Sequence, residues 1–477
     1  MIEDNSRKLG FGALVAIVFG MMVGSGIYNI PQNMAVSSGL TGVLIAWGVT
    51  ALCILSLVAT FKTLGDRRPD LDAGIYQYAH EGFGKYLGFN MAWGYWLSTC
   101  IANIAYAAML NDSFGAFFPE LLKHGWATFV FGTVLIWLMC GLLLRGIRTA
   151  RIVNFVMAAL KVCAIGFIVV LLWIYASVSG LESALTTGGP ESLWEQVSGT
   201  MMVTLFCFIG IEGAVMMSAR AKNPRHVGKA SVAGFSLAWL LYVLVAVLSF
   251  GIMSKAGLSG LDDPSVAYVL KRCAGDWAYY FVIVSVIVSL LGGWLAWNLV
   301  CSQCAMEAAE VGVFPHRFLR MNGNGMPSYA TVASAVMMEM FLMVVILSDD
   351  LYLSAVNITG MMVLPPYLMC GLYLWKASYR PAELGNPGRV KLARFRAAGV
   401  ACTLSCGWMI WAGGVDLLLQ TTIFYLPGAV FYMMTCNNGR HIMSKQAFLA
   451  AFSRGERWQL GLIAAGAVVS GIMLICG

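Results

Sequence analysis

Residues 9–37 read LGFGALVAIVFGMMVGSGIYNIPQNMAVS, an apolar stretch with Gly24-Ser25-Gly26 at its centre. Each glycine costs a helix about 1 kcal/mol, so the tripeptide predicts a helix break at membrane depth. Broken backbone is tolerated there only where it is buried in protein or lines a cavity. Such a break frees N–H groups at the start of the second half-helix, which suits a carboxylate. A patch of small residues for helix packing would also account for the glycines.

The composition is that of a membrane protein. Of 477 residues, 59% are hydrophobic and 11% are charged, and the mean hydropathy is +0.77. A membrane-spanning helix needs about 20 mostly apolar residues. Twelve such segments are expected, near residues 10–37, 41–63, 88–118, 126–145, 152–177, 197–219, 231–253, 278–306, 328–348, 351–376, 395–416 and 419–436. A thirteenth candidate, 458–477, follows an amphipathic stretch at 437–457, expected to be cytoplasmic. The predicted fold class is an all-α polytopic membrane protein.

The distribution of basic residues predicts the orientation of the chain. If residues 1–9 are cytoplasmic, the loops on that side hold most of the Lys and Arg residues, and the opposite loops hold mainly Asp and Glu. The net charge of +7 then follows from topology, and nucleic-acid binding is not indicated. The first segment is too long for a signal-peptide core and lacks a cleavage site after it, so we treat it as structure.

Enzyme and metal-binding patterns are missing from the sequence. The thirteen cysteines lie almost entirely in apolar segments and give no disulfide framework. Cys301 and Cys304 form a C-x-x-C motif, but on a predicted membrane helix. His80-Glu81 lacks the second histidine of the H-E-x-x-H zinc motif. We therefore expect a protein that is not an enzyme and that uses no metal and no cofactor.

Two charged residues inside the spans indicate a functional interior. Lys161 lies midway along the fifth segment, where an ammonium group costs about 3 kcal/mol or more unless it faces a cavity or a partner. Glu212 lies in the sixth segment between Gly210 and Gly213. This second glycine-rich interruption comes five spans after the first, which is the sign of an inverted repeat with a binding site near the membrane midplane.

Polar side chains on the third segment point the same way. On a helix, Tyr95, Ser98 or Thr99, Asn103 and Tyr106 fall near one face, which hydrocarbon would not tolerate. Phe206 and Trp294 are further candidates, because each lies near backbone loosened by glycine.

These motifs resemble the amino acid–polyamine–organocation superfamily, and within it the bacterial basic amino acid antiporters. The likeness covers about residues 9–436 and rests on Gly24-Ser25-Gly26-Ile27, Tyr95-Trp96-Leu97 with Asn103, Phe208-Ile209-Gly210-Ile211-Glu212, Lys222-Asn223-Pro224, Leu291-Gly292-Gly293-Trp294 and Pro366-Tyr367. It implies a LeuT-like five-plus-five inverted repeat with helices one and six broken around the substrate. The repeats would span residues 10–177 and 197–376, and residues 395–436 would form two further helices. The thirteenth segment resembles the arginine/ornithine branch more than the twelve-helix arginine/agmatine exchangers.

The resemblance also implies substrate contacts. The amides of Ser25 and Gly26 would hold the carboxylate, and carbonyls near Val23 and Ile209 the amino group. The remaining implied contacts are Ser98, Thr99, Asn103, Phe206, Trp294 and Thr359. Phe206 stands where arginine/agmatine exchangers carry tryptophan, and its ring can still attract a cation, by about 0.5–2 kcal/mol.

Gate and ion-site roles are implied in the same way. Tyr95, Glu212 and Tyr367 match an inner gate in which a carboxylate meets two phenols, and Trp294 matches a residue that closes over the substrate. Lys161 resembles the helix-five lysine that replaces an ion in sodium-independent relatives. Its ammonium would tie helix five to broken helix one and could also move protons.

The implied function is exchange of external arginine for internal agmatine or ornithine by alternating access, in a bacterial inner membrane with the N-terminus cytoplasmic. The partners would be cationic amino acids and amines and the lipid bilayer. Relatives are often dimers, although no segment here marks a homodimer interface. The alternatives are a proton-coupled amino acid uptake carrier, a lysine/cadaverine or histidine/histamine exchanger, and, more remotely, a non-transporting membrane sensor of amino acids.

Overall fold

The computed structural model of the chain describes residues 10–71, 74–123, 125–186, 191–213, 225–345, 351–436, 448 and 451–476. Three parts of the sequence-based prediction lie outside these residues: the N-terminal segment 1–9, the motif Lys222-Asn223-Pro224, and most of the amphipathic segment 437–457. Within the described ranges the chain is helical, and the only β-type pairing is a single bridge between Met321 and Pro327.

Among the described residues, each predicted apolar segment contains helix, although the segment at 197–219 is described only to residue 213 and is not helical from Cys207 to Glu212. The first half of the chain contains α1 (Phe11–Met22), α2 (Gly26–Ser37), α3 (Leu40–Arg67), α4 (Tyr76–Phe83), α5 (Lys85–Gly115), η2 (Pro119–Lys123), α6 (Trp126–Leu144), α7 (Ile147–Tyr175), α8 (Val178–Thr186), α9 (Leu193–Gly199) and α10 (Met201–Phe206). The second half contains α12 (Arg225–Phe250), α13 (Lys255–Ser259), α14 (Ser265–Ala274), α15 (Asp276–Glu310), η4 (His316–Leu319), α16 (Ser328–Val345), α17 (Leu351–Ala377), η5 (Pro381–Leu384), α18 (Arg389–Ala412), α19 (Val415–Cys436) and α21 (Arg454–Cys476).

The apolar helices indicate a multi-pass membrane protein. Six described helices are each long and apolar enough to cross a membrane, and two bent pairs bring the number to eight if each pair is one span. The first pair is α1 and α2, which meet at 48°. The second pair bends by 85° between Ala159–Tyr175 of α7 and α8, a turn that the sequence analysis did not predict.

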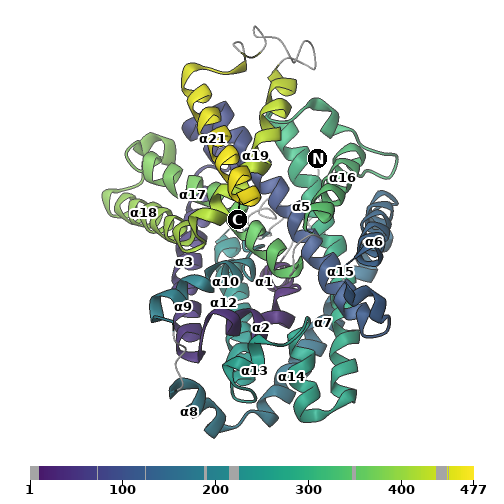
Figure 1. Cartoon of the computed structure of the whole chain (residues 1–477). Helices are drawn as coiled ribbons and strands as arrows, with labels where there is room; N and C mark the ends of the chain where they lie inside the picture. The colour runs from purple at the N-terminus through teal and green to yellow at the C-terminus, as the bar shows by residue number, and fades with distance from the viewer. Residues whose placement is uncertain are drawn as a thin grey trace.

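Helix α5 is almost completely buried, although it is not one of the helices counted as apolar enough to cross a membrane. Of its 31 residues, 28 are buried, and these include Asn90, Asn103 and Asn111. The helix lies near the centre of the molecule in Figure 1, whereas α6 and α18 lie on opposite sides of it. Because protein surrounds α5, its polar residues meet other side chains instead of lipid.

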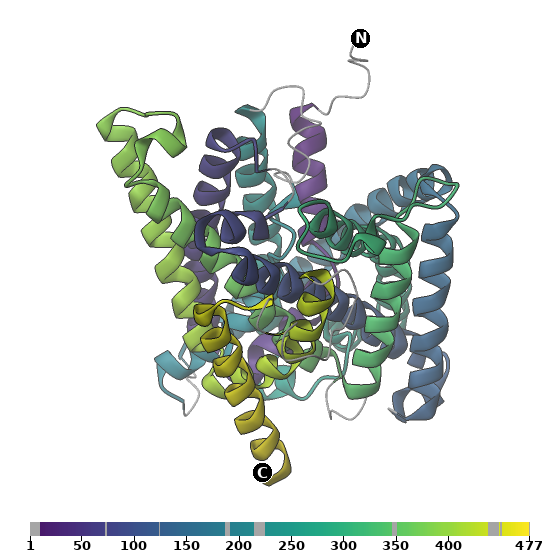
Figure 2. The same cartoon turned by 90° about the horizontal axis from the view of Figure 1, so that it is seen from above.

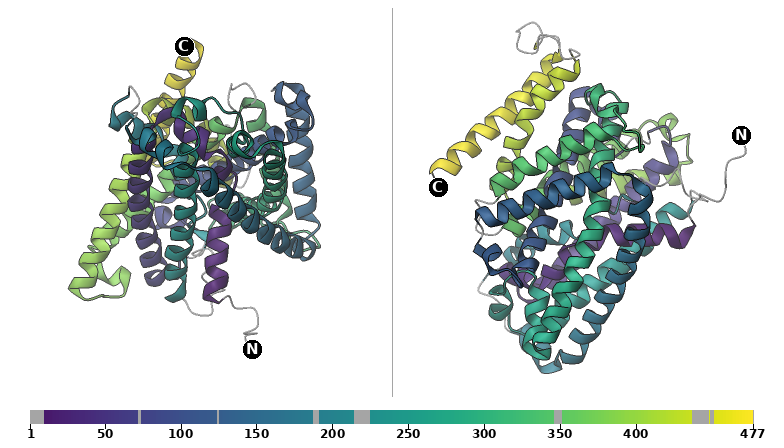
Figure 3. Two further views of the ribbon diagram at one scale, coloured as in Figure 1. Left: turned by 90° about the horizontal axis from the view of Figure 1, so that it is seen from below. Right: turned by 90° about the vertical axis from the view of Figure 1, so that its right-hand side faces the viewer.

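The two ends of the described chain lie at opposite ends of the molecule. Figure 2 shows the beginning of α1 and the end of α21 on opposite sides. Helix α21 runs along the outer edge beside α19 (Figure 3). It is tied to the interior through Glu456, whose Oε1 accepts a hydrogen bond of 3.2 Å from the amide of Tyr86 in the first turn of α5. The helix that contains the thirteenth predicted segment thus begins a few residues earlier than expected and contacts the central helix through Glu456, which precedes that segment.

Helices α17 and α18 pack with their backbones in close contact. A Cβ atom built on Gly399 of α18 would lie 2.7 Å from the backbone nitrogen of Trp375 in α17. A Cβ atom on Gly371 of α17 would lie 2.9 Å from the nitrogen of Thr403 in α18. Small residues permit this approach, as is typical of helix pairs in membranes.

We expect Gly399→Ala to lower stability by about 1–3 kcal/mol, because the new methyl group would collide with backbone that cannot rotate away. The midpoint of thermal unfolding in detergent measures the effect. Gly407→Ala is the matched control on the same helix, since nothing lies within 4 Å of a Cβ atom there. It should be neutral or slightly stabilising. Equal midpoints for the two variants would contradict the close α17–α18 contact.

Candidate functional site

The predicted break in the first span lies at residues 23–25, between α1 and α2. A helix leaves its last four carbonyls without internal partners, and at membrane depth water does not replace them. Here every carbonyl at the end of α1 accepts a hydrogen bond. The donors are the amide of Val23 for Phe19 (2.9 Å), Lys161 Nζ for Gly20 (3.0 Å) and for Val23 (2.6 Å), Trp297 Nε1 for Met21 (3.3 Å) and the Tyr242 hydroxyl for Met22 (2.7 Å).

Lys161 lies where the sequence analysis expected it. It comes from α7, is only 5% exposed, and bonds to the C-terminal end of α1. That end carries the negative pole of the helix dipole, so a cation is favourable there. The expected role of Val23 changes as a result. Its carbonyl already accepts the 2.6 Å bond from Lys161, so only one lone pair remains for a substrate amino group.

The other side of the break presents free donors. Among the described residues, the amides of Ser25, Gly26 and Ile27 donate no hydrogen bond. These amides begin α2, where the dipole is positive, and such an arrangement suits a carboxylate group. The hydroxyl of Tyr352 in α17 donates to Ser25 Oγ at 3.3 Å and closes one side of this site.

The second break follows α10 and lies directly against the first. Gly210 has a φ of +106°, a conformation that favours glycine. A Cβ atom on Gly210 would lie 3.0 Å from Met21 Cβ, and one on Gly26 would lie 3.1 Å from Cys207 Sγ. The Tyr242 hydroxyl lies 3.0 Å from the carbonyl oxygen of Cys207 as well as 2.7 Å from that of Met22. One phenol therefore joins the two breaks.

The three residues expected to form a gate meet in the structure. Tyr95 of α5 donates to Glu212 Oε1 at 2.6 Å, and Tyr367 of α17 donates to Oε2 at 2.9 Å. The amide of Gly210 adds a third bond, of 3.1 Å, to Oε2. Glu212 is fully buried. Because a buried carboxylate is costly unless hydrogen-bonded, the two phenols and the amide make this position tolerable.

A narrow cavity lies between the two breaks. Ser25, Gly26, Phe206 and Ile209 line it together with two aromatic residues, Tyr106 and Trp297. Its free volume for water is about 20 Å³. That is room for about one water. An amino acid would therefore require the lining side chains to move.

The remaining predicted contacts divide into two groups. The hydroxyls of Ser98 and Thr99 each donate at 2.7 Å to a carbonyl of their own helix, but their oxygens can still accept, so the expected substrate contacts stay a prediction. In contrast, Asn103 Oδ1, Trp294 Nε1 and Thr359 Oγ1 are buried and have no hydrogen-bond partner among the described residues. Unpartnered buried polar atoms are uncommon and need an explanation, such as an absent ligand or water.

Several residues at the site were not recognised in the sequence. Tyr242, Trp297 and Tyr352 support the break, and Tyr106, which the sequence placed on a polar helix face, lines the cavity. The sequence gives only a weak indication of these residues. A phenol or indole in an apolar span needs a hydrogen-bond partner for its polar atom, but the sequence does not identify that partner.

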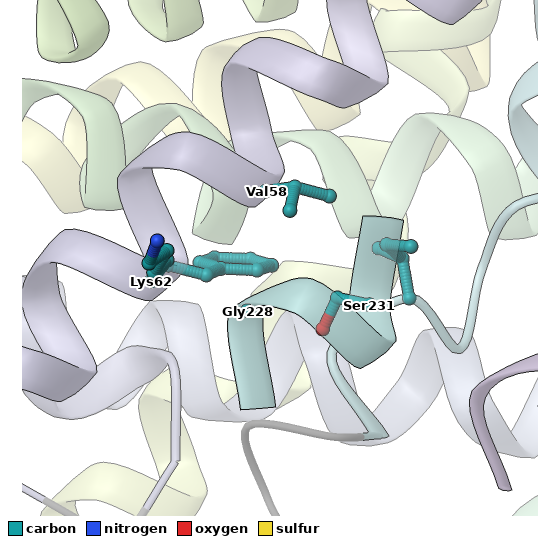
Figure 4. A pocket seen from close by; sticks show the side chains of 6 residues that line it. Val58, Lys62, Gly228 and Ser231 are labelled. Carbon is teal, nitrogen blue, oxygen red and sulfur yellow. The ribbon is translucent and has the colours of Figure 1, made fainter. Parts of the chain in front are cut away.

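A second cavity, between α3 and α12, is drawn in Figure 4. It lies beside Ile211, and Lys62 and Ser231 lie on opposite sides of it. The aliphatic part of Lys62 packs on Gly228, where a Cβ atom would lie 2.7 Å from Lys62 Cγ. The space has no room for a water molecule and brings together no further predicted residue.

Comparison with known proteins gives a consistent set of relatives. A family model described as amino acid permease matches residues 9–436. An arginine/ornithine antiporter of Pseudomonas aeruginosa is 37% identical over 443 residues, which is 91% of this chain and 92% of that protein. An arginine/agmatine antiporter of Chlamydia felis is 34% identical over 453 residues, covering 92% and 93%. Another, of Chlamydia trachomatis, is 35% identical over 471 residues, covering 97% and 95%.

We expect Tyr242→Phe to lower stability by about 1–3 kcal/mol, because it leaves the carbonyls of Met22 and Cys207 without their donor. The thermal unfolding midpoint in detergent measures this loss. Tyr175→Phe, at a 41% exposed residue at the end of α7, removes the same hydroxyl without that consequence. A midpoint for Tyr242→Phe equal to that of Tyr175→Phe would show that the phenol does not hold the breaks together.

Proposed function

Because the chain belongs to the amino acid permease family, we propose that it is an arginine antiporter, which exchanges arginine for ornithine or agmatine across a membrane. The relatives in Pseudomonas and Chlamydia named above, at 34–37% identity over nine-tenths or more of the chain, support this substrate class. The family and these relatives are transporters, so we propose transport and not catalysis.

The observation that carries the proposal is the meeting of two helix breaks around one cavity with unpaired amides. In the proposed complex, the amides of Ser25 and Gly26 bind the substrate carboxylate, which is the anion suited to a helix N-terminus. The carbonyl of Ile209 receives the amino group. Phe206 lies against the cationic side chain, whose charge its ring face attracts by about 0.5–2 kcal/mol.

The unpartnered atoms support a second conformation. Asn103 Oδ1, Trp294 Nε1 and Thr359 Oγ1 are buried without partners. We propose that they contact the substrate once the narrow cavity expands. Trp294 then covers the bound substrate on one side, while Tyr95, Glu212 and Tyr367 separate and re-form as the gate on the other side.

The order of the helices supports a repeated architecture. A broken span (α1 and α2) is followed by α3, α5, α6 and α7, and a second interrupted span (α10) by α12, α15, α16 and α17. We propose a five-plus-five inverted repeat over residues 10–177 and 197–376. Residues 395–436 and 458–477 add three spans. The basic loops support a cytoplasmic N-terminus in a bacterial inner membrane, with 437–457 on the same side.

The free-energy cost of leaving the site empty would make transport an obligatory exchange. Without substrate, the free amides of α2 and the unpartnered polar atoms would stay unsatisfied while the carrier reorients, so the empty form should reorient poorly. Arginine and ornithine carry equal charge. Agmatine carries one more positive charge than arginine, so its exchange would respond to membrane potential, by about 2.3 kcal/mol per charge per 100 mV.

Proteoliposomes loaded with ornithine, agmatine, lysine, cadaverine, histamine or buffer test this function through uptake of labelled arginine. We expect rapid uptake with at least one of internal ornithine and internal agmatine, and at least tenfold less into buffer-loaded vesicles. Equal uptake into buffer-loaded vesicles under a pH gradient would replace exchange by proton-coupled import. Binding of arginine without any flux would indicate a sensor.

Glu212→Gln is expected to slow exchange at least tenfold, because an amide offers one acceptor oxygen where the carboxylate accepts bonds from two phenols and Gly210. Initial rates of arginine exchange at saturating substrate measure the effect. Glu182→Gln on α8, where the side chain is exposed, is the control and should exchange at the wild-type rate. A Glu212→Gln rate within twofold of wild type would refute the gate.

A further inference from the structure

Tyr106 occupies a place made for it by two glycines. It lies on α5, is 4% exposed and lines the cavity between the helix breaks. A Cβ atom on Gly24 would lie 2.5 Å from the Tyr106 hydroxyl oxygen, and one on Gly293 would lie 3.2 Å from Cε1 of the ring. Any larger residue at either position would displace the ring. The hydroxyl is therefore held beside the first break.

The hydroxyl has no partner in this position. Among the described residues, no hydrogen bond to the Tyr106 oxygen is found, as is also true of the buried phenols of Tyr28, Tyr86 and Tyr425, whereas the phenols of Tyr95, Tyr242 and Tyr367 are bonded. Tyr106 also borders the cavity together with Ser25 and Gly26, whose amides are free. Three hydrogen-bond donors without protein acceptors thus belong to residues that line one narrow cavity, which indicates an anionic group as their ligand.

No side chain at the cavity replaces the anion that these donors lack. No acidic residue is among those that line the cavity, and the buried carboxylate of Glu212 is already bonded to two phenols and an amide. A ligand with a carboxylate satisfies the donors. A ligand that has lost its carboxylate leaves them unpaired and brings a second positive charge with no counter-ion.

We propose that the Tyr106 hydroxyl donates a hydrogen bond to the α-carboxylate of the substrate and thereby selects exchange partners that retain this carboxylate. The chain would then exchange arginine for ornithine in preference to agmatine. This inference rests on the proposed antiport of arginine. A site built to hydrogen-bond a particular group discriminates strongly against analogues that lack it, because its own polar groups are left unpaired.

The test compares wild type with Tyr106→Phe, which removes only the hydroxyl. The kcat/KM for arginine uptake is measured against internal ornithine and against internal agmatine. We expect wild type to favour ornithine at least tenfold. In Tyr106→Phe, the KM for ornithine should rise about tenfold while that for agmatine stays unchanged, so the preference collapses. Tyr175→Phe is the control and should keep the wild-type ratio.

Calorimetric binding to the purified protein in detergent gives a readout that does not depend on transport. Arginine should bind wild type at least tenfold more tightly than agmatine or arginine methyl ester, which lacks the negative charge, and Tyr106→Phe should reduce that difference. Parallel weakening of all three ligands would reveal a merely structural role and overturn the proposal, as would a wild type that binds agmatine as well as arginine. If wild type binds arginine selectively but exchanges it for nothing, antiport fails while the role of Tyr106 stands.

Discussion

The architecture depends on the satisfaction of the carbonyls at the end of α1. A helix that stops inside a membrane leaves four acceptors in a medium without water, and each costs several kcal/mol if unpaired. Here the donors come from α7, α12 and α15, three helices far apart in sequence. Lys161 contributes most, because an ammonium group supplies several donors together with a charge that suits the dipole. Because the carbonyls at the end of α1 are all hydrogen-bonded, the break is tolerated even though the amides at the start of α2 have no partner.

The two breaks behave as one unit because they touch through positions that carry no side chain. Gly210 packs on Met21 and Gly26 packs on Cys207. The Tyr242 hydroxyl contacts a backbone carbonyl at each break. A displacement of α1 would therefore strain the turn after α10, and the reverse holds as well. Glu212, two residues beyond Gly210, transmits such a displacement to α5 and α17 through its two phenols. The proposed substrate site and the proposed gate are thus joined by a short path of direct contacts.

The helix breaks could be predicted from the sequence because glycine pairs in a membrane span have few explanations. Lys161 and Glu212 could be predicted as functional residues because a charged side chain inside a span also has few explanations. The sequence also placed Tyr95, Asn103 and Tyr106 on one face, which follows from the helical period alone. It could not decide between partners. Ser98 and Thr99 share that face, yet their hydroxyls bond to their own helix, a choice set by rotamers that the period does not encode. The contribution of Tyr242 and the 85° bend before α8 depend on contacts between distant segments, which one sequence does not reveal.

The position of Tyr106 between Gly24 and Gly293 has a consequence for the evolution of such proteins. The three residues belong to three different spans, and the size of one limits the other two. Substitution of either glycine would be tolerated only after the tyrosine had been replaced by a smaller residue. The glycines should therefore persist in lineages that keep the tyrosine and drift in those that lose it. Covariation of these three positions among related carriers would therefore indicate which lineages kept this part of the cavity.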